Sequence, residues 1–525
     1  MSLKQTRGRT LAVALGVTLV AVPARPGYGR EPAQDARRLV DACIRAEGGA
    51  KRLAALRSVE YQGTLTTSDG KAAGHYALIL ERPNRLYQEV TIGSETVREA
   101  YNGKSAWRED AAGLRTLTGA EGTRLEAAAH YRNDRLAHYR KDKVRLRPLS
   151  QENIRGHNAE RLEVTTLAGV KREVAIDSAS HLVIEEASPG GGSAPETGGR
   201  GAGADKDDER VFYDDYRTVD GVAEPYRIEF VAPDRHWVVS ITRVVHNPPV
   251  NDAVFAFPAA SARPLPDIAV LLHSVDAHQK AIEKLVEQYT CDKTSEEFEV
   301  DSHGVTKSKV KEYQVFYLDG DEVDRLVKKD RKELSASEQQ KQNEHIQKVV
   351  RDYEKRHAKE EEREKKGEPP KKHDDDVTVS DFLRIDRFTN PRRETFRGHE
   401  VIVFDFEPNP DYKPAKTVER LLHELSGAVW IDEPDADVVR LEAHLTNSFK
   451  LAGGLFASLQ KGSAFVFEQA KINNEVWLPS YLEAHVSARV LLFKGLGGNF
   501  TQRYTNYQKF RVESVTKQGE VKPNP

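Results

Sequence analysis

Histidine, serine and carboxylate side chains could carry chemistry in this chain, but their spacing matches no catalytic motif. His423-Glu424 is followed by Leu, Ser and Gly, so the zinc-binding pattern HExxH is missing. No GxSxG nucleophile elbow is present. A Ser/His/Asp set stays open, because these residues are abundant and need only meet in space. We therefore name no catalytic residue and expect no enzyme, and a hydrolase with an unrecognised site is the weakest functional reading.

Metal ligands are also poorly represented. His273 and His278 are five residues apart, which does not suit two ligands on one helix face, and no cysteine or carboxylate pattern joins them. The run Asp374, Asp375 and Asp376 could bind a cation, but consecutive acids usually lie in solvent. We expect neither a metal nor a cofactor.

Large aromatic side chains are the remaining candidates for a binding site. Trp107 follows a predicted hairpin turn, and Trp430 and Trp477 lie beside the repeated motifs described below. Phe456 and Phe465 lie in one of the most apolar stretches of the second half. These five residues could form the wall of an apolar ligand cavity, although ordinary core packing is the simpler interpretation.

The first 24 residues have the features of an export signal. Lys4, Arg7 and Arg9 precede an uncharged apolar run from Leu11 to Ala24, which ends in small residues. This pattern predicts a cleaved signal peptide over residues 1–24, with an uncleaved anchor as the alternative. We expect a periplasmic or otherwise exported protein that is not integral to the membrane, because no later stretch approaches 18 apolar residues.

Composition narrows the function classes. The 525 residues include 79 Lys and Arg against 82 Asp and Glu, a balance that argues against a nucleic-acid partner. The charged fraction of 31% predicts sheets with one solvated face. Cys43 and Cys291 fit no metal spacing. They could form one disulfide after export, but two isolated buried thiols are the preferred reading.

Patterning predicts a first domain over residues 33–260. A helical pattern over residues 35–57 is interrupted at Gly48-Gly49, and alternating strands follow. Asp69-Gly70 and Asn102-Gly103 are hairpin turns, since a tight turn needs the positive φ that these residues adopt easily. A Gly-rich stretch over 188–209 is expected to be a flexible loop.

A linker over 261–269 and a second domain over 270–516 follow. The second domain opens with a helix, and a strand pair turns at Asp319-Gly320. A highly charged helical insert is expected over 328–376, with a capping box formed by Ser335 and Glu338. We expect its charged helix over 335–366 to project into solvent, because a run of charges is usually a solvated face. The alternative is that this helix binds a partner protein of the cell envelope.

Three motifs recur in the same order in both halves. Gly156-His157 corresponds to Gly398-His399, and Ile176-Asp177 corresponds to Ile431-Asp432. Pro225 corresponds to Pro479, 48 and 47 residues after the respective aspartates. Order, residue type and spacing together indicate a tandem repeat of one β topology, in which these residues hold turns and strand edges.

Both halves resemble the LolA/LolB-like lipoprotein-carrier superfamily of the periplasm, also called outer-membrane lipoprotein-sorting proteins. The first half carries the resemblance in the opening helix with Gly48-Gly49, in VEYQGTL, in ERPNRLYQEV and in YNGKSAW. The Gly-His, Ile-Asp and Pro motifs follow in the order of that family's strands. The resemblance implies an antiparallel sheet curled into an incomplete barrel, with helices on its concave face and an apolar cavity for acyl chains.

We therefore expect an α+β chain of mostly antiparallel β-structure, built from two tandem unclosed half-barrels with helices covering each concave face. The expected function is that of a non-enzymatic periplasmic carrier for a hydrophobic ligand, such as a lipid or a lipoprotein acyl chain. The alternative is a structural or protein-interaction module of the cell envelope without a small ligand.

Overall fold

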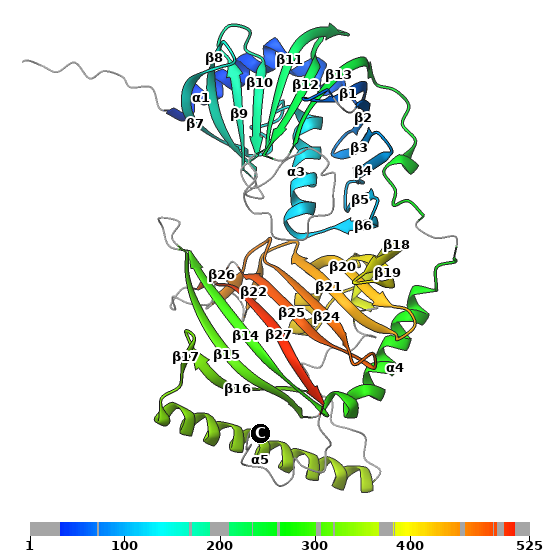
Figure 1. Ribbon diagram of the computed structural model, residues 1–525, viewed down its shortest axis with the longest axis vertical. Coiled ribbons are helices and arrows are strands. Elements are labelled where there is room, and N and C mark those ends of the chain that lie inside the picture. Colours follow the sequence, from blue (N-terminus) through cyan, green and yellow to red (C-terminus); the bar gives the residue numbers. More distant parts are fainter. Residues whose placement is uncertain are drawn as a thin grey trace, which may run out of the picture.

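The computed structural model describes residues 32–509 except 71–72, 167–170, 189–208, 234, 260–262, 301–305, 319–320, 367–381, 383, 452–456, 487 and 491–497. The expected signal peptide, the Asp374–Asp376 run and almost all of the Gly-rich stretch lie outside the described residues. The chain is mostly antiparallel β, with two large unclosed sheets and few helices (Figure 1).

The first sheet has 13 strands in the order β6-β5-β4-β3-β2-β1-β13-β12-β11-β10-β9-β8-β7. Its first strand pairs with its last, so that the two free edges are β6 and β7. The strands are β1 (Ser58–Thr67), β2 (Ala73–Glu81), β3 (Arg85–Ile92), β4 (Glu95–Tyr101), β5 (Ala106–Asp110), β6 (Gly113–Leu117), β7 (Arg145–Ile154), β8 (His157–Thr165), β9 (Lys171–Asp177), β10 (Val183–Ser188), β11 (Glu209–Val219), β12 (Val222–Ala232) and β13 (Arg235–His246).

Three helices cover one face of this sheet. Helices α1 (Pro32–Ala46) and α2 (Ala50–Ala55) are separated at Gly48-Gly49 as predicted. Helix α3 (Gly119–Asp134) connects the free edges β6 and β7 and lies inside the curve of the sheet (Figure 1). All three helices and most of the strands contribute to one apolar core, because strand alternation points every second side chain toward the helices.

The second sheet has 11 strands in the order β17-β16-β15-β14-β27-β25-β24-β21-β20-β19-β18. Again the first and last strands pair, and the free edges are β17 and β18. The strands are β14 (Tyr289–Val300), β15 (Thr306–Leu318), β16 (Asp321–Lys329), β17 (Lys332–Glu333), β18 (Asp386–Phe396), β19 (His399–Pro408), β20 (Leu425–Asp432), β21 (Asp437–Leu445), β24 (Ala464–Ile472), β25 (Val476–Val486) and β27 (Gly498–Lys509). Strands β22 (Phe449–Leu451), β23 (Ala457–Leu459) and β26 (Ala488–Val490) form a small separate sheet.

The remaining helices are η1 (Asp252–Val254), α4 (Ile268–Val286), α5 (Ala336–Lys365) and α7 (Thr417–Leu422). Helix α4 begins inside the segment expected to be a linker, and its Leu271, Leu272 and Val275 pack on the second sheet. The expected insert also begins later than predicted, since residues 328–333 belong to β16 and β17. Helix α5 connects the free edges β17 and β18, as α3 does in the first sheet, but lies outside the curve of its sheet (Figure 1).

The repeated motifs occupy matching places in the two sheets. Arg155-Gly156 and Arg397-Gly398 both have positive φ and turn β7 into β8 and β18 into β19. The following histidine lies 3.5 Å from the aspartate that ends a neighbouring strand: His157 Nδ1 from Asp177 Oδ1, and His399 Nδ1 from Asp432 Oδ2. The shared motifs therefore hold one strand–turn arrangement in each half.

A buried arginine joins the two sheets. The Arg392 guanidinium, on β18, donates to Thr116 Oγ1 of the edge strand β6 and to the carboxylates of Glu394 and Asp405. It also lies 3.9 Å from the centre of the Phe257 ring. This ion cluster is almost fully buried and places one charge with two counter-charges at the contact between the sheets. Lys104 with Glu407 and Ser105 with Asp405 make further contacts there.

Candidate functional site

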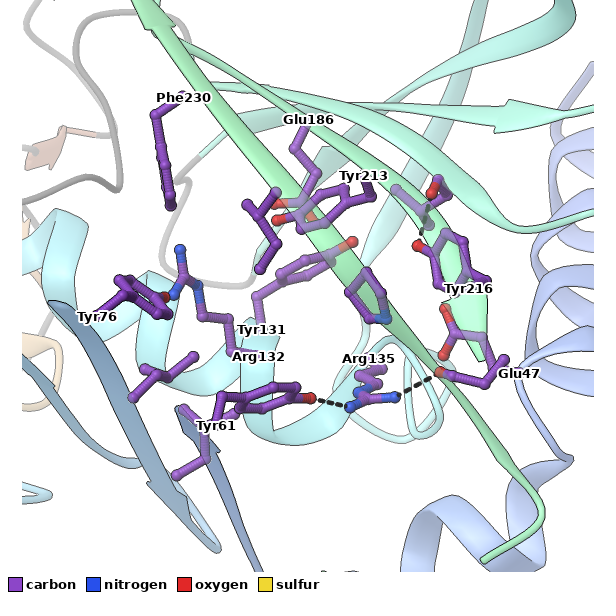
Figure 2. Close-up of a pocket in the computed structure, with 16 residues that line it drawn as sticks. Glu47, Tyr61, Tyr76, Tyr131, Arg132, Arg135, Glu186, Tyr213, Tyr216 and Phe230 are labelled. Atoms are coloured by element: carbon purple, nitrogen blue, oxygen red, sulfur yellow. Dashed lines mark hydrogen bonds between the residues drawn. The ribbon is translucent and has the colours of Figure 1, made fainter. Parts of the chain in front are cut away.

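The first sheet and α3 enclose a cavity of about 90 Å³. Apolar walls come from β2, β10 and β12, including Leu78, Leu80, Val183, Ile228 and Phe230. The rest of the lining is polar: five tyrosines, two arginines and two glutamates reach the same space. Figure 2 shows that Tyr61, Tyr76, Tyr131, Tyr213 and Tyr216 surround the Arg132 and Arg135 side chains, with Glu47 and Glu186 on one side.

Arg135 anchors one end of the cavity. It directly follows α3 with a left-handed backbone (φ 47°), and its Nη2 lies 2.6 Å from Glu224 Oε2. Tyr61 donates to the same oxygen at 2.6 Å, and His246 Nε2 lies 2.8 Å from Glu224 Oε1. Burial opposes ionisation of Glu224, but Arg135 and the hydrogen bonds hold the pKa of this carboxyl below its ordinary value. The carboxylate therefore ties the end of α3 to β1, β12 and β13.

Glu47, just after α1, is a buried acid with few hydrogen bonds to its carboxyl group. Cys43 Sγ donates to its Oε1 at 3.6 Å, and Oε2 has no hydrogen-bond partner among the described residues. Burial raises the pKa of Glu47 to about 7, against the opposing effect of Arg135. Cys43 and Cys291 are both buried and free, which confirms the reading of two isolated thiols.

Arg132 lies at the other end of the cavity. Its Nη1 donates to Gln88 Oε1 at 3.2 Å, and no described carboxylate forms a salt bridge with it. The Tyr76 hydroxyl and Gln88 Nε2 are buried without hydrogen-bond partners among the described residues. In contrast, Glu186 is paired with Arg172, whose Nη1 lies 2.7 Å from Glu186 Oε2. The Arg132 end of the cavity thus has one cation without a carboxylate partner, with the Tyr76 hydroxyl in the lining and Gln88 bonded to Arg132 behind it.

The aromatic residues selected from the sequence lie elsewhere. Trp107 is buried against Ala100 and Leu114, and its Nε1 donates to Phe255 O at 2.9 Å. Trp430 and Trp477 are brought together in one cluster of the second sheet, on the face opposite Val429 and Ile431, which α4 covers. Phe465 is half-buried on β24, and Phe456 lies outside the described residues. None of the four described residues lines the cavity, and a ligand-binding role for all five stays a prediction.

Sequence reasoning missed the polar lining because it searched the strands for apolar alternation. The available signal was a polar residue at a core-facing strand position. Tyr76, Leu78 and Leu80 alternate on β2 and are all buried, so a tyrosine hydroxyl had to enter the interior. Tyr131 and Arg132 of α3 lie four and three residues before Arg135, which directly follows the helix, so the three side chains can reach the same side of the helix.

The described part of the chain lacks two features. No group of three or more His, Cys, Asp or Glu side chains there could hold a metal ion. None of its helices combines the length and apolar character needed to cross a membrane.

No protein-family model matches the chain, and no curated protein is significantly similar to it. Among solved structures, it is similar to a DUF1329 family protein from Desulfovibrio piger, with 12% identity, 44% of this chain and 100% of that chain covered, and a TM-score of 0.30. An outer membrane lipoprotein-sorting protein domain from Vibrio parahaemolyticus matches with 9% identity, coverage of 42% and 97%, and a TM-score of 0.29. A LolA superfamily protein from Nitrosomonas europaea matches with 11% identity, coverage of 42% and 97%, and a TM-score of 0.28. Each of these matches covers less than half of this chain and nearly all of the solved structure.

Proposed function

We propose that this chain is an exported, non-enzymatic carrier that binds a hydrophobic ligand, such as a lipid or a lipoprotein acyl chain, between α3 and the first sheet. The cavity at this place carries the proposal. It lies inside a sheet whose free edges, β6 and β7, are connected only through α3 and the segment after it. A concave, partly apolar space between a sheet and a covering helix is a typical small-molecule site.

The volume of the cavity sets a condition on binding. Drug-sized ligands occupy pockets of roughly 300–1,000 Å³, whereas this space measures about 90 Å³. A long acyl chain therefore fits only if α3 moves away from the sheet. This movement must break polar contacts between α3 and the sheet, including Asn133 Nδ2 to Arg85 O at 2.9 Å and Asn84 Nδ2 to His130 Nε2 at 3.2 Å. The pair of Arg135 with Glu224 meanwhile holds the end of α3 in place.

Mass spectrometry of lipids extracted from the purified, exported protein tests the proposal. We expect one lipid class at a stoichiometry near one per chain. The matched variant Asn84→Cys/His130→Cys, joined by a short bismaleimide, should load much less lipid than the same variant without the linker. Protein that carries no lipid after export, and takes up none from vesicles, would contradict the carrier function. Equal loading with and without the linker would show that α3 need not move.

We also propose that the chain consists of two copies of one unit, over 33–260 and 270–516, with an exported N-terminal signal over 1–24 and a linker over 261–269. The shared strand order and the two His–Asp contacts support this division. Expression of each segment alone tests it: both should give cooperative unfolding transitions and β-type circular dichroism. A segment that stays unfolded alone contradicts independent units.

An interaction module of the cell envelope is the second candidate, favoured by α5. The predicted capping box is present, since Glu338 N donates to Ser335 Oγ and Ser335 N donates to Glu338 Oε2. Ile346, Val350 and Tyr353 form an apolar stripe that is only half-buried. If α5 is an arm for a partner protein, deletion of 336–366 should abolish co-purification of one envelope protein without a change in the melting temperature. Retained co-purification would exclude this role for α5.

A further inference from the structure

We infer that the cavity of the first sheet holds a carboxylate, the head group of an acidic amphiphile such as a fatty acid, between Arg132, Tyr76 and Gln88. This inference rests on the proposed carrier function and specifies the chemical class of the ligand. It assigns the polar end of the cavity to the head group and the apolar wall to the start of the tail.

The charges around the cavity leave Arg132 without a counter-ion. Arg135 is paired with Glu224 and Arg172 with Glu186. Arg132 instead contacts two neutral groups, the Gln88 side-chain oxygen and the Tyr76 hydroxyl, and forms no salt bridge with a carboxylate among the described residues. The half-buried Arg132 guanidinium stays protonated, so its partial desolvation is not relieved by loss of a proton. An anionic ligand at this point would complete the ion pair.

Two further donors are available at the same place. The Tyr76 hydroxyl and Gln88 Nε2 belong to residues that are each 2% exposed, and neither atom has a hydrogen-bond partner among the described residues. Figure 2 shows the Tyr76 ring beside the end of the Arg132 side chain. A carboxylate offers about four lone-pair sites to such a group of donors, and its bonds to a guanidinium are charge-assisted.

The surroundings favour a single negative charge with an apolar tail. One unpaired cation balances one carboxylate, whereas a phosphate monoester would bring additional charge. Tyr76, Leu78 and Leu80 point to the same face of β2, so the wall becomes apolar directly beyond the hydroxyl. The volume of about 90 Å³ is small and can take only the head group and the first carbons. The remaining tail needs the movement of α3.

Calorimetric titration of the full chain with dodecanoate, 1-dodecanol and butyrate tests this assignment. We expect dodecanoate to bind roughly tenfold to hundredfold more tightly than the alcohol, as removal of a charged hydrogen-bond group usually costs. Arg132→Leu should abolish this preference, and Tyr76→Phe, which keeps the ring, should reduce it. Arg147→Gln, an exposed arginine on β7, is the control and should leave it unchanged.

The outcomes separate this inference from the proposed function. Equal affinity for dodecanoate and dodecanol, or an unchanged preference in Tyr76→Phe and Arg132→Leu, would overturn the head-group site and leave the carrier function intact. If dodecanoate, dodecanol and butyrate all fail to bind, the result would count against both the head-group site and the carrier function. Butyrate that binds as tightly as dodecanoate supports the carboxylate site and identifies a short acid as its ligand.

Discussion

Replacement of Glu224 by glutamine should destabilise the first half more than any exposed charge substitution. The Glu224 side chain is completely buried and accepts from Arg135, Tyr61 and His246 at 2.6–2.8 Å. Glu224→Gln leaves the Arg135 guanidinium, which is 16% exposed, without a counter-charge. Removal of one partner of a buried ion pair costs about 3–5 kcal/mol. For a unit of this size we expect the melting temperature to fall by about 6–20 °C.

Urea unfolding followed by circular dichroism, with thermal melting alongside, measures this effect. The double variant Arg135→Met/Glu224→Gln should recover part of the loss, because it removes the unpaired charge. Asp215→Asn breaks an exposed pair with Arg217 in the same sheet and should cost less than about 1 kcal/mol. A cost for Glu224→Gln as small as that of Asp215→Asn, or a double variant less stable than either single one, would refute the reasoning.

The Glu224 carboxyl should also make the folding stability of the first half depend on pH. Because the pKa of Glu224 lies below its ordinary value of 4.5, its contribution is present above pH 4.5 and is lost as the pH falls through the lowered pKa. The stability difference between the wild type and Glu224→Gln should therefore shrink in acid. A difference that stays constant between pH 7 and pH 3 would contradict this assignment.

Three other perturbations test separate parts of the structure. The pKa of Glu47 is raised to about 7, so between about pH 4.5 and 7 the carboxyl ionises in the unfolded chain but stays protonated in the folded protein, and stability falls across this range. Glu47→Gln should therefore gain about 3 kcal/mol over wild type at pH 8 and nothing at pH 4 in urea unfolding. Arg392→Met should cost about 3–5 kcal/mol and enlarge the radius of gyration in X-ray scattering, whereas an unchanged radius would show that other contacts hold the sheets together. A Cβ at Gly427 would lie 1.8 Å from Glu442 O on the paired strand, so Gly427→Ala should cost about 1–3 kcal/mol in thermal unfolding, and a neutral substitution would mean that β20 and β21 separate easily.

Local features of this fold could be predicted from the sequence because a few neighbouring residues determine them. Gly48-Gly49 separates two helices since both residues have positive φ, which glycine adopts without a Cβ clash. Asn102 closes the predicted hairpin by accepting from the backbone N–H groups of Lys104 and Ser105. The Ser335–Glu338 capping box follows from a spacing of three residues.

The cavity could not be predicted, because its side chains meet only after the sheet has formed. Tyr61 and Glu224 are 163 residues apart in the chain and bond at 2.6 Å because β1 pairs with β13 and β13 with β12. The tryptophans were the obvious aromatic candidates from residue type, but strand alternation turns Trp430 away from the face that α4 covers.

Sequence alone therefore determined the turns, the break between α1 and α2 and the recurrence of the Gly-His, Ile-Asp and Pro motifs, all of which depend on local backbone preference and spacing. Tertiary structure decided which polar groups share the interior. Arg132 is an ordinary surface residue by its type, and only the fold of α3 across the sheet places it beside Tyr76 without a carboxylate partner. Burial creates the need for a counter-charge there, and burial is a property of the whole sheet.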